Sequence, residues 1–143
     1  PVTMILFTNH DCGYCRDFHE QLMPRLKVEF IETGMLRVIT VPFALQKYPN
    51  STSNIRTFIC GVEAGSGAAV HRNLFAGRTS FPRLQSCIDS TDGKVDMVMH
   101  EQASIAESLG VSLVPSYIMN GQTFVGLPEY ADLRGQINAA LKR

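Results

Sequence analysis

The sequence predicts an α/β protein in which a β-α-β unit is followed by an all-helical insertion and then by a β-β-α unit. Two apolar, strand-like runs enclose a segment with helical periodicity in the first 42 residues. Glycines divide the stretch from about 50 to 110 into short pieces without an alternating run. An Asn-Gly pair then joins two further strand-like runs ahead of a final helical pattern. We expect a single domain, 1–143, because 143 residues fit one.

The first strand and the first helix are predicted from their apolar patterns. Val2–Phe7 is almost entirely apolar, which is typical of a strand that is buried on both faces. A helix should begin around Cys12 or Gly13 and run to about residue 31. Pro24 should bend this helix, because proline removes one of its hydrogen bonds. The buried stripe of the helix consists of Phe18, Leu22, Leu26 and Phe30.

A second strand completes the first unit. Gly34 is the expected end of the helix, and Met35–Val41 is a strand that ends at Pro42. Strand, helix and strand together have about the ~30 residues of a βαβ unit. We therefore expect the two strands to pair in parallel, with a right-handed crossover.

The insertion is predicted to form four short helices that pack on the sheet, rather than a separate domain. In the third of these helices, Ser80 can cap the first turn and Pro82 fits within it. The expected spans are Ile55–Ala64, Ala68–Ala76, Phe81–Asp89 and Asp96–Leu109.

The last unit is predicted from its turn chemistry. Val114–Met119 is a strand entered through Pro115, and Thr123–Val125 is its return strand. The Asn-Gly pair at 120–121 favours a two-residue hairpin turn, since both residue types accept a positive φ. Pro128 should open a final helix. The apolar positions of that helix are Tyr130, Leu133, Ile137 and Leu141.

Charge and hydropathy exclude two kinds of partner. Thirteen Lys and Arg residues balance thirteen Asp and Glu residues, so no bulk positive charge would hold a nucleic acid. No apolar run approaches the ~20 residues of a membrane span, so we expect no membrane insertion. Because the chain begins at Pro1 rather than Met, we expect an N-terminal segment, such as an export signal, to have been removed.

Two cysteines, Cys12 and Cys15, lie where the first strand meets the first helix. A helix N-terminus has unpaired N–H groups and a partial positive charge, both of which stabilise a thiolate. Zinc would need a second close pair of cysteines or nearby histidines, and so small a loop makes a poor structural disulfide. Half of a zinc site and a structural disulfide are the alternatives. We expect redox chemistry, with no metal and no cofactor.

The residues around the pair are expected to tune its reactivity. With Gly13 and Tyr14 between the cysteines, backbone amides of the first turn would point toward Cys12. A protonated His10 would favour the Cys12 thiolate, whereas Asp11 would oppose it. A stabilised thiolate stabilises the reduced form, which makes the disulfide more oxidising.

Cys60 and Cys87 lie in the insertion and have two interpretations. They are either buried thiols, which are common for cysteine, or a structural disulfide, which we favour for an exported protein. His19 lies one helical turn after the dithiol and could face either the site or solvent. His71 and His100 are expected to be capping or surface residues.

Several short motifs, spread from the dithiol to the Asn-Gly turn, carry a resemblance to a known family. At the dithiol these are Cys12-Gly13-Tyr14-Cys15, Phe18, His19 and Leu22-Met23-Pro24. Further on they are Val41-Pro42-Phe43 and the segments 71–75, 81–90, 106–111, 114–115 and 120–121. Together they resemble DsbA-like thioredoxin-fold proteins over nearly the whole chain.

This resemblance implies a thioredoxin fold, β-α-β then β-β-α, with an all-helical insertion. It implies that Cys12 is the exposed nucleophile and that Cys15 is the buried resolving partner. It also implies a cis bond before Pro115, packed against the dithiol, and backbone groups of Val114 that pair with an extended substrate peptide. Many members of the family have a buried acid six residues before the nucleophile, where this chain has Leu6.

The expected function is that of a thiol-disulfide oxidoreductase of the cell envelope, acting as a dithiol oxidase. Its disulfide would pass to cysteine-containing substrate proteins through a mixed disulfide at Cys12, which Cys15 resolves. A membrane or soluble redox partner would reset the dithiol, in the periplasm or another extracytoplasmic compartment. The alternatives are a disulfide isomerase, a reductase for a dedicated client, a non-catalytic peptide-binding or chaperone module on the same fold, and a zinc-binding structural protein.

Overall fold

The computed structural model describes residues 1–143, and they form two compact units. Residues 1–8, 12–41 and 111–143 make up one of them, which we call the sheet unit. Residues 9–11 and 42–110 make up the other, which we call the helical unit. The helical unit therefore includes the expected insertion and also the short segment that directly precedes Cys12.

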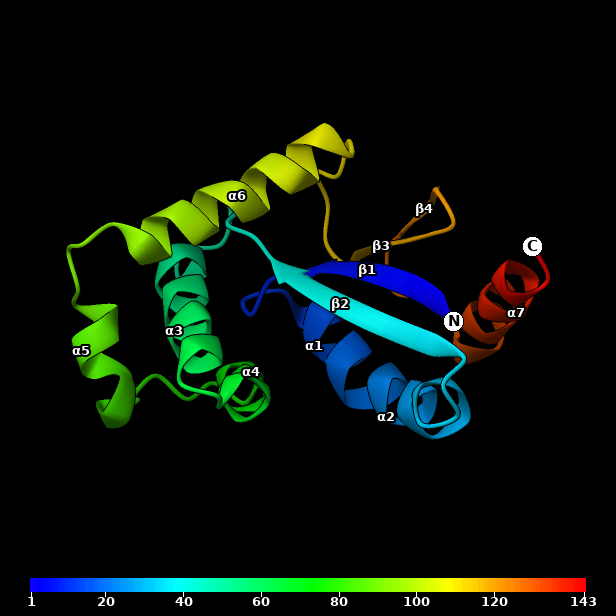
Figure 1. Ribbon diagram of the computed structural model, residues 1–143, viewed down its shortest axis with the longest axis horizontal. Helices are drawn as coiled ribbons and strands as arrows, with labels where there is room; N and C mark the ends of the chain where they lie inside the picture. Colours follow the sequence, from blue (N-terminus) through cyan, green and yellow to red (C-terminus); the bar gives the residue numbers. More distant parts are fainter. The chain divides into compact units, whose positions relative to one another are not determined.

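The sheet unit contains four strands, which confirms the predicted α/β fold class (Figure 1). Their order in the sheet is β2-β1-β3-β4. The strands are β1 (Val2–Thr8), β2 (Leu36–Pro42), β3 (Ser116–Met119) and β4 (Gln122–Val125).

Strand pairing places the two halves of the sequence side by side. The Val2 N–H donates to the Met35 carbonyl at 2.9 Å, so β1 and β2 start at the same end, as a parallel pair requires. β3 runs antiparallel to β1, with Ile5 opposite Ile118, and antiparallel to β4. The predicted hairpin turn has positive φ at both central residues, 49° at Asn120 and 77° at Gly121.

One long helical segment joins β1 to β2 and spans residues 13–31, as predicted. It comprises α1 (Gly13–Asp17), η1 (Phe18–Leu22), α2 (Met23–Leu26) and η2 (Lys27–Ile31), of which η1 and η2 are π-helical. The Met23 N–H bonds to the Phe18 carbonyl, five residues back, so the turn before Pro24 is widened. The helix thus accommodates the proline with wider turns and does not break there.

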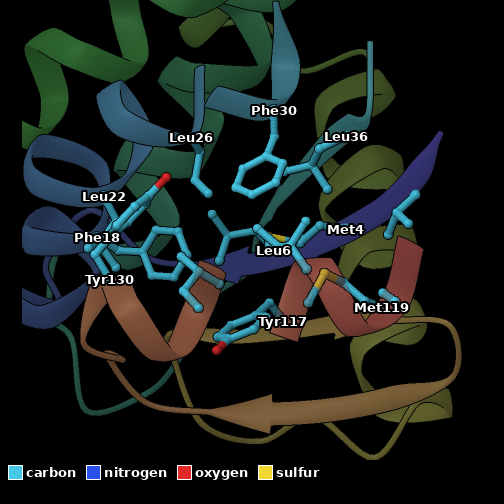
Figure 2. Close-up of a cluster of buried hydrophobic side chains, with 14 residues drawn as sticks. Met4, Leu6, Phe18, Leu22, Leu26, Phe30, Leu36, Tyr117, Met119 and Tyr130 are labelled. Carbon is cyan, nitrogen blue, oxygen red and sulfur yellow. The ribbon is translucent and has the colours of Figure 1, made fainter. Parts of the chain in front are cut away.

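The core of the sheet unit lies between the sheet, this long helix and the C-terminal helix α7 (Tyr130–Leu141), as Figure 2 shows. The predicted helical stripes face it: Leu26, Leu133 and Ile137 are all 0% exposed. One boundary differs from the prediction, because Glu129 is the N-cap residue and Pro128 stays outside α7. The buried members of the core are Val2, Met4, Leu6, Phe18, Leu22, Leu26, Phe30, Leu36, Tyr117, Met119, Tyr130, Leu133, Ile137 and Ala140.

The helical unit contains four α-helices and a short 3-10 turn. The third predicted helix is the least regular, because a 3-10 turn (η3) precedes only four α-helical residues and Phe81, not Ser80, is the N-cap residue. The last helix begins at Lys94, directly after Gly93 with φ 85°. The elements are α3 (Ser51–Glu63), α4 (Gly67–Phe75), η3 (Pro82–Leu84), α5 (Gln85–Ile88) and α6 (Lys94–Ser108). None of the protein's helices is long and apolar enough to cross a membrane.

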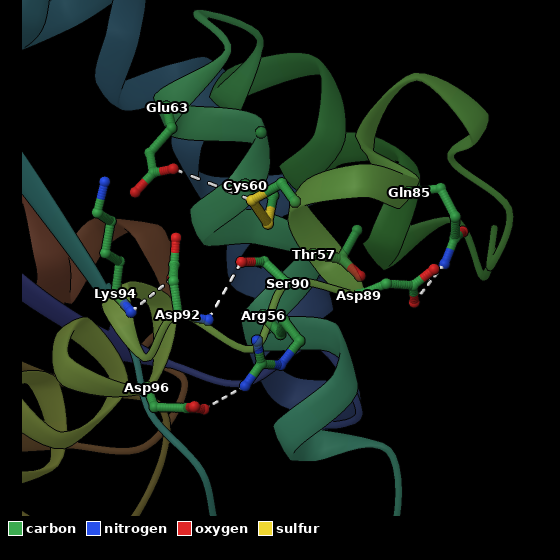
Figure 3. The surroundings of a disulfide bond; sticks show 12 residues. Arg56, Thr57, Cys60, Glu63, Gln85, Asp89, Ser90, Asp92, Lys94 and Asp96 are labelled. Atoms are coloured by element: carbon green, nitrogen blue, oxygen red, sulfur yellow. Dashed lines mark hydrogen bonds and ion pairs between the residues drawn. A yellow bond between two sulfur atoms is a disulfide. The ribbon is translucent and has the colours of Figure 1, made fainter.

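Two features tie the helices of this unit together. Cys60 on α3 and Cys87 on α5 form a disulfide bond, with Cα atoms 5.8 Å apart (Figure 3). Helices α3 and α4 approach closely at Gly61, where a Cβ atom would lie 2.7 Å from a methyl carbon of Val70. Of the two interpretations of these cysteines, the structure contains the favoured one, the disulfide bond.

Candidate active site

The dithiol lies at the N-terminus of the long helix. Cys12 is the N-cap residue of α1, with extended backbone angles, and Cys15 lies in the first turn. The Cys15 N–H donates to the Cys12 sulfur at 3.2 Å. A hydrogen bond from a backbone amide and the positive end of the helix both favour negative charge on that sulfur.

A loop from the distant C-terminal part of the chain completes this site. The Cys12 thiol donates to the Val114 carbonyl, with sulfur and oxygen 3.7 Å apart, although the residues are 102 positions apart. The Val114–Pro115 peptide bond is cis, and Pro115 is fully buried. The Gly126 N–H donates to the Pro115 carbonyl at 2.8 Å, which links this loop to the end of β4. The structure thus brings Cys12, Cys15, Val114 and Pro115 together.

Cys12 is more buried than the resemblance implied, whereas Cys15 is buried as expected. Both are present as thiols, and Cys12 is 3% and Cys15 1% exposed. The expectation of an exposed Cys12 was wrong, because its sulfur is held by the Cys15 amide and the Val114 carbonyl. Gly13 and Tyr14 are exposed instead, and the Tyr14 side chain is 67% accessible.

Leu6, six residues before Cys12, stands where the resemblance led us to look for a buried acid. It belongs to the core of the sheet unit and lies opposite Tyr117 in the pairing of β1 with β3. Burial raises the pKa of Tyr117 to about 12, and its hydroxyl donates to the Gln136 side chain at 2.5 Å. Neither member of this cross-strand pair changes its charge near neutral pH.

His10, a predicted tuning residue, lies in an aromatic cluster of the helical unit. Its Nε2 is 2.9 Å from Nδ1 of His71, and its ring centroid is 4.8 Å from that of Phe75 and 5.8 Å from that of Phe58. His71, expected to be a capping or surface residue, is half-buried. His71 and Phe75 are one turn apart on α4, a spacing that places both rings on one helix face. His100 is exposed, as expected.

Asn9 was not predicted to matter, yet it organises the segment before the dithiol. It is 0% exposed, and its Nδ2 donates to the Phe43 carbonyl at 3.0 Å and to the Ser51 hydroxyl at 2.5 Å. Its Oδ1 accepts from the Asp11 N–H at 2.9 Å. The sequence signal for this role was the residue type, because an Asn side chain often accepts a hydrogen bond from the backbone N–H two residues later, in an Asx turn.

Metal-binding side chains do not gather anywhere in the chain. No group of three or more His, Cys, Asp or Glu side chains is arranged so that it could hold a metal ion. The histidine pair and the dithiol each offer two candidate ligands, fewer than a structural zinc site uses.

A two-cysteine motif at a helix N-terminus, in contact with a cis-proline loop next to a four-stranded sheet, is the arrangement of thioredoxin-fold proteins. A family model described as "Thioredoxin" matches residues 1–139. The chain belongs to this thioredoxin family. The predicted thioredoxin fold is therefore confirmed, and the predicted resemblance to DsbA-like proteins agrees with the structures that the chain matches.

Solved structures similar to the chain include three with functional or cellular descriptions. A periplasmic thioredoxin-like protein from Salmonella enterica serovar Typhimurium has 19% identity and a TM-score of 0.76, with 99% of this chain and 85% of that one covered. BdbD from Bacillus subtilis, in its oxidised form, has 16% identity and a TM-score of 0.79, covering 100% and 89%. The alpha-DsbA1 protein of Wolbachia pipientis has 15% identity and a TM-score of 0.80, covering 99% and 86%. A comparison with the sequences of curated proteins gave no match.

Proposed function

We propose that this protein is a thiol-disulfide oxidoreductase that exchanges a Cys12–Cys15 disulfide with cysteine-containing proteins. The observation that supports this most is the environment of the Cys12 sulfur. It accepts the Cys15 amide at 3.2 Å at a helix N-terminus and lies against the backbone of the Val114–Pro115 loop. Such a sulfur is stabilised as a thiolate, the form that attacks and leaves in disulfide exchange.

The preferred direction is dithiol oxidation. A substrate thiolate attacks the Cys12 sulfur of the disulfide, the bond between Cys12 and Cys15 breaks, and Cys15 leaves as a thiolate that takes up a proton. A second substrate thiolate then attacks the substrate sulfur of the mixed disulfide and releases Cys12 as a thiolate. The substrate loses two electrons to the protein, and a redox partner that carries a disulfide or an equivalent two-electron oxidant resets the dithiol.

Two features of the site favour this direction and this substrate class. The Cys15 amide stabilises the Cys12 thiolate, hence the reduced form, and this makes the disulfide a stronger oxidant. The Val114 backbone at the proline loop can pair with an extended peptide, so an unfolded segment next to a cysteine would fit. Tyr14, exposed between the cysteines, would contact such a segment.

We place the protein outside the cytoplasm, in the periplasm or an equivalent compartment. A structural disulfide such as that between Cys60 and Cys87 is typical of proteins in oxidising compartments. One of the similar structures is described as a periplasmic protein, which agrees with this placement.

A second candidate function is a peptide-binding module without redox turnover. The low exposure of Cys12, 3%, is the observation that favours it, because an attacking sulfur has to be reached by its substrate. Both functions would use the Val114–Pro115 loop, so only the chemistry of the dithiol separates them.

The experiment follows the oxidation of a reduced, unfolded protein by the oxidised chain. Wild type should form disulfides in the substrate and end as the dithiol, with two electrons transferred per chain. Cys15→Ser cannot carry the disulfide, so it should not oxidise the reduced protein. Offered a disulfide-containing protein instead, its Cys12 thiolate should attack and break that bond and remain as a mixed disulfide at Cys12, seen by intact mass, because the resolving thiol is missing. A chain that binds the unfolded protein without oxidising, reducing or trapping it would be the peptide-binding module.

A further inference from the structure

We propose that Asn54 is a positioning residue for the nucleophile, acting on Cys12 through Asp11. This inference rests on the proposed function, since it concerns the reactivity of the same cysteine. It starts from Asp11, the residue that the sequence placed next to the nucleophile as an opposing charge.

Both carboxylate oxygens of Asp11 are bound by donors at the start of α3. The Asn50 N–H donates to Oδ2 at 2.8 Å, and the Asn54 side-chain amide donates to Oδ1 at 3.1 Å. Asn50 is the N-cap residue of this 13-residue helix, and its carbonyl accepts the Asn54 N–H at 2.9 Å. The carboxylate therefore lies at the positive end of a full-length helix, where negative charge is stabilised.

The backbone of Asp11 is held as firmly as its carboxylate. The Asp11 N–H donates to Asn9 Oδ1, and Asn9 is itself buried and bonded to the Phe43 carbonyl and the Ser51 hydroxyl. The Ser51 hydroxyl also accepts the Leu45 N–H at 3.0 Å. All of these partners belong to the helical unit, which therefore holds Asp11, the residue bonded to Cys12.

Covalent geometry makes this placement matter for the nucleophile. A trans peptide bond holds the Cα atoms of Asp11 and Cys12 about 3.8 Å apart, so the charge of one always acts on the other. A carboxylate without compensating donors, this close, would disfavour a thiolate on Cys12. The amides of α3 compensate that charge. The Cys12 thiolate is therefore more stable than it would be beside an Asp11 carboxylate without these donors.

Asn54 is the member of this arrangement that substitution can test. The Asn50 contact comes from the backbone and survives a change of side chain, whereas the Asn54 contact comes from the side chain. Alanine at this position removes the donor and keeps the helix, because alanine is the best helix former. Ser53→Ala is the matched control, because Ser53 lies in the same turn and its hydroxyl bonds to the Asn50 carbonyl rather than to Asp11.

The measurement is the equilibrium between the full chain and glutathione, read as the fractions of dithiol and disulfide. The equilibrium constant is that for reduction of the Cys12–Cys15 disulfide by glutathione. Asn54→Ala should make the disulfide less oxidising and lower this constant about 3- to 10-fold, because a charge-assisted hydrogen bond to Asp11 is lost. Ser53→Ala should leave the constant unchanged. If Asn54→Ala does not fold, Asn54→Leu replaces the side chain with one of similar size that cannot donate.

A double-mutant cycle tests whether Asn54 acts through the charge of Asp11. In an Asp11→Asn background there is no carboxylate to compensate, so Asn54→Ala should no longer change the constant. An equal change in both backgrounds, or no change in the wild-type background, would overturn the inference. If wild type itself fails to exchange with glutathione, the proposed function fails instead, so the two failures are distinguishable.

Discussion

The two cysteine pairs of this protein have opposite environments, one in each unit. Cys12 and Cys15 lie two residues apart at a helix N-terminus, and an amide hydrogen bond favours a thiolate on Cys12. Cys60 and Cys87 join two helices of the helical unit, and a carboxylate oxygen of Glu63 lies 3.9 Å from the Cys87 sulfur (Figure 3). A neighbouring anion disfavours a thiolate. The pair that we propose to be reactive and the bonded pair therefore differ in their local charge.

The units also differ in what holds them together. The sheet unit has a four-stranded backbone ladder and a core of fourteen buried residues, and no disulfide crosses it. The helical unit has no strand pairing, and its core has seven buried residues, one of which is Cys60. A smaller core leaves more of the stability to a covalent link. The comparison therefore predicts different consequences for changes in the two units.

The largest expected effect follows removal of the nucleophile. Cys12→Ser should abolish the oxidation of a reduced substrate protein, because a hydroxyl cannot form the mixed disulfide. The free energy of unfolding should change little, since serine occupies the same site. Quantifying the remaining substrate thiols at successive times measures the oxidation, and a urea titration measures the free energy of unfolding. Turnover at the wild-type rate would contradict the assigned role of Cys12.

Removal of the other pair should have the converse effect. The double variant Cys60→Ala, Cys87→Ala should lose about 3 kcal/mol of unfolding free energy, because a link between residues 27 positions apart restricts the unfolded chain. Below its melting temperature the variant should retain oxidase activity. Urea unfolding of wild type and variant, both without added reductant, checks the first value. A large loss of activity in the folded variant would show that the two cysteine pairs are not independent.

Two helical glycines allow a smaller test of packing in the two units. Gly61→Ala should destabilise the protein by about 1–2 kcal/mol, because the new methyl group would clash with Val70 and the gain in helix propensity offsets only part of that cost. Gly135→Ala on α7 meets nothing within 4 Å and should stabilise by up to about 1 kcal/mol. Thermal unfolding of both variants measures the difference. Equal shifts would mean that Val70 moves aside without loss.

The smallest expected effect is a pH dependence in the sheet unit. Hydrogen bonds from Tyr130, at 2.5 Å, and from Arg134 hold the pKa of Glu29 below its usual value of 4.5. A lowered pKa in the folded state gives a stabilisation that is present above pH 4.5 and is lost as the pH falls through the folded value.

The matching variant is Glu29→Gln, which has no charge to lose. Wild type should lose its stability advantage over this variant as the pH is lowered from 6 to about 3. Urea titrations of both proteins at several pH values measure the effect. A constant difference across this range would show that Glu29 does not titrate differently in the folded and unfolded states.

Patterns that are local in sequence predicted most of the fold. The stripe of the long helix, with Leu26 and Phe30, faces the core as expected, and Asn120-Gly121 forms the predicted turn. The errors lie where local signals compete. Ser80 looked like a helix cap, but the segment after it begins with a 3-10 turn whose N-cap residue is Phe81, and Pro128 lies outside the final helix that it was expected to open. Helix ends depend on which carbonyls and amides find partners, and tertiary packing decides that.

The candidate site was predictable only in part, for a similar reason. The spacing of Cys12 and Cys15 at a strand-to-helix junction identifies them as a candidate redox pair. The low exposure of Cys12 and the pairing of His10 with His71 were not predictable, because each depends on side chains far away in the sequence. Asn9 was missed, since a buried polar residue is recognised only by the partners that satisfy it.

The sequence by itself determined the order of the elements and the position of the dithiol at the start of a helix. These follow from periodicity, turn residues and covalent spacing, which act over a few residues. Only the tertiary structure decided that Val114 lies against Cys12, 102 positions away, and that Asn54 binds the carboxylate beside it. Those contacts arise when separate elements pack, so no short stretch of sequence encodes them. The dithiol is therefore local in origin, whereas its surroundings come from distant parts of the chain.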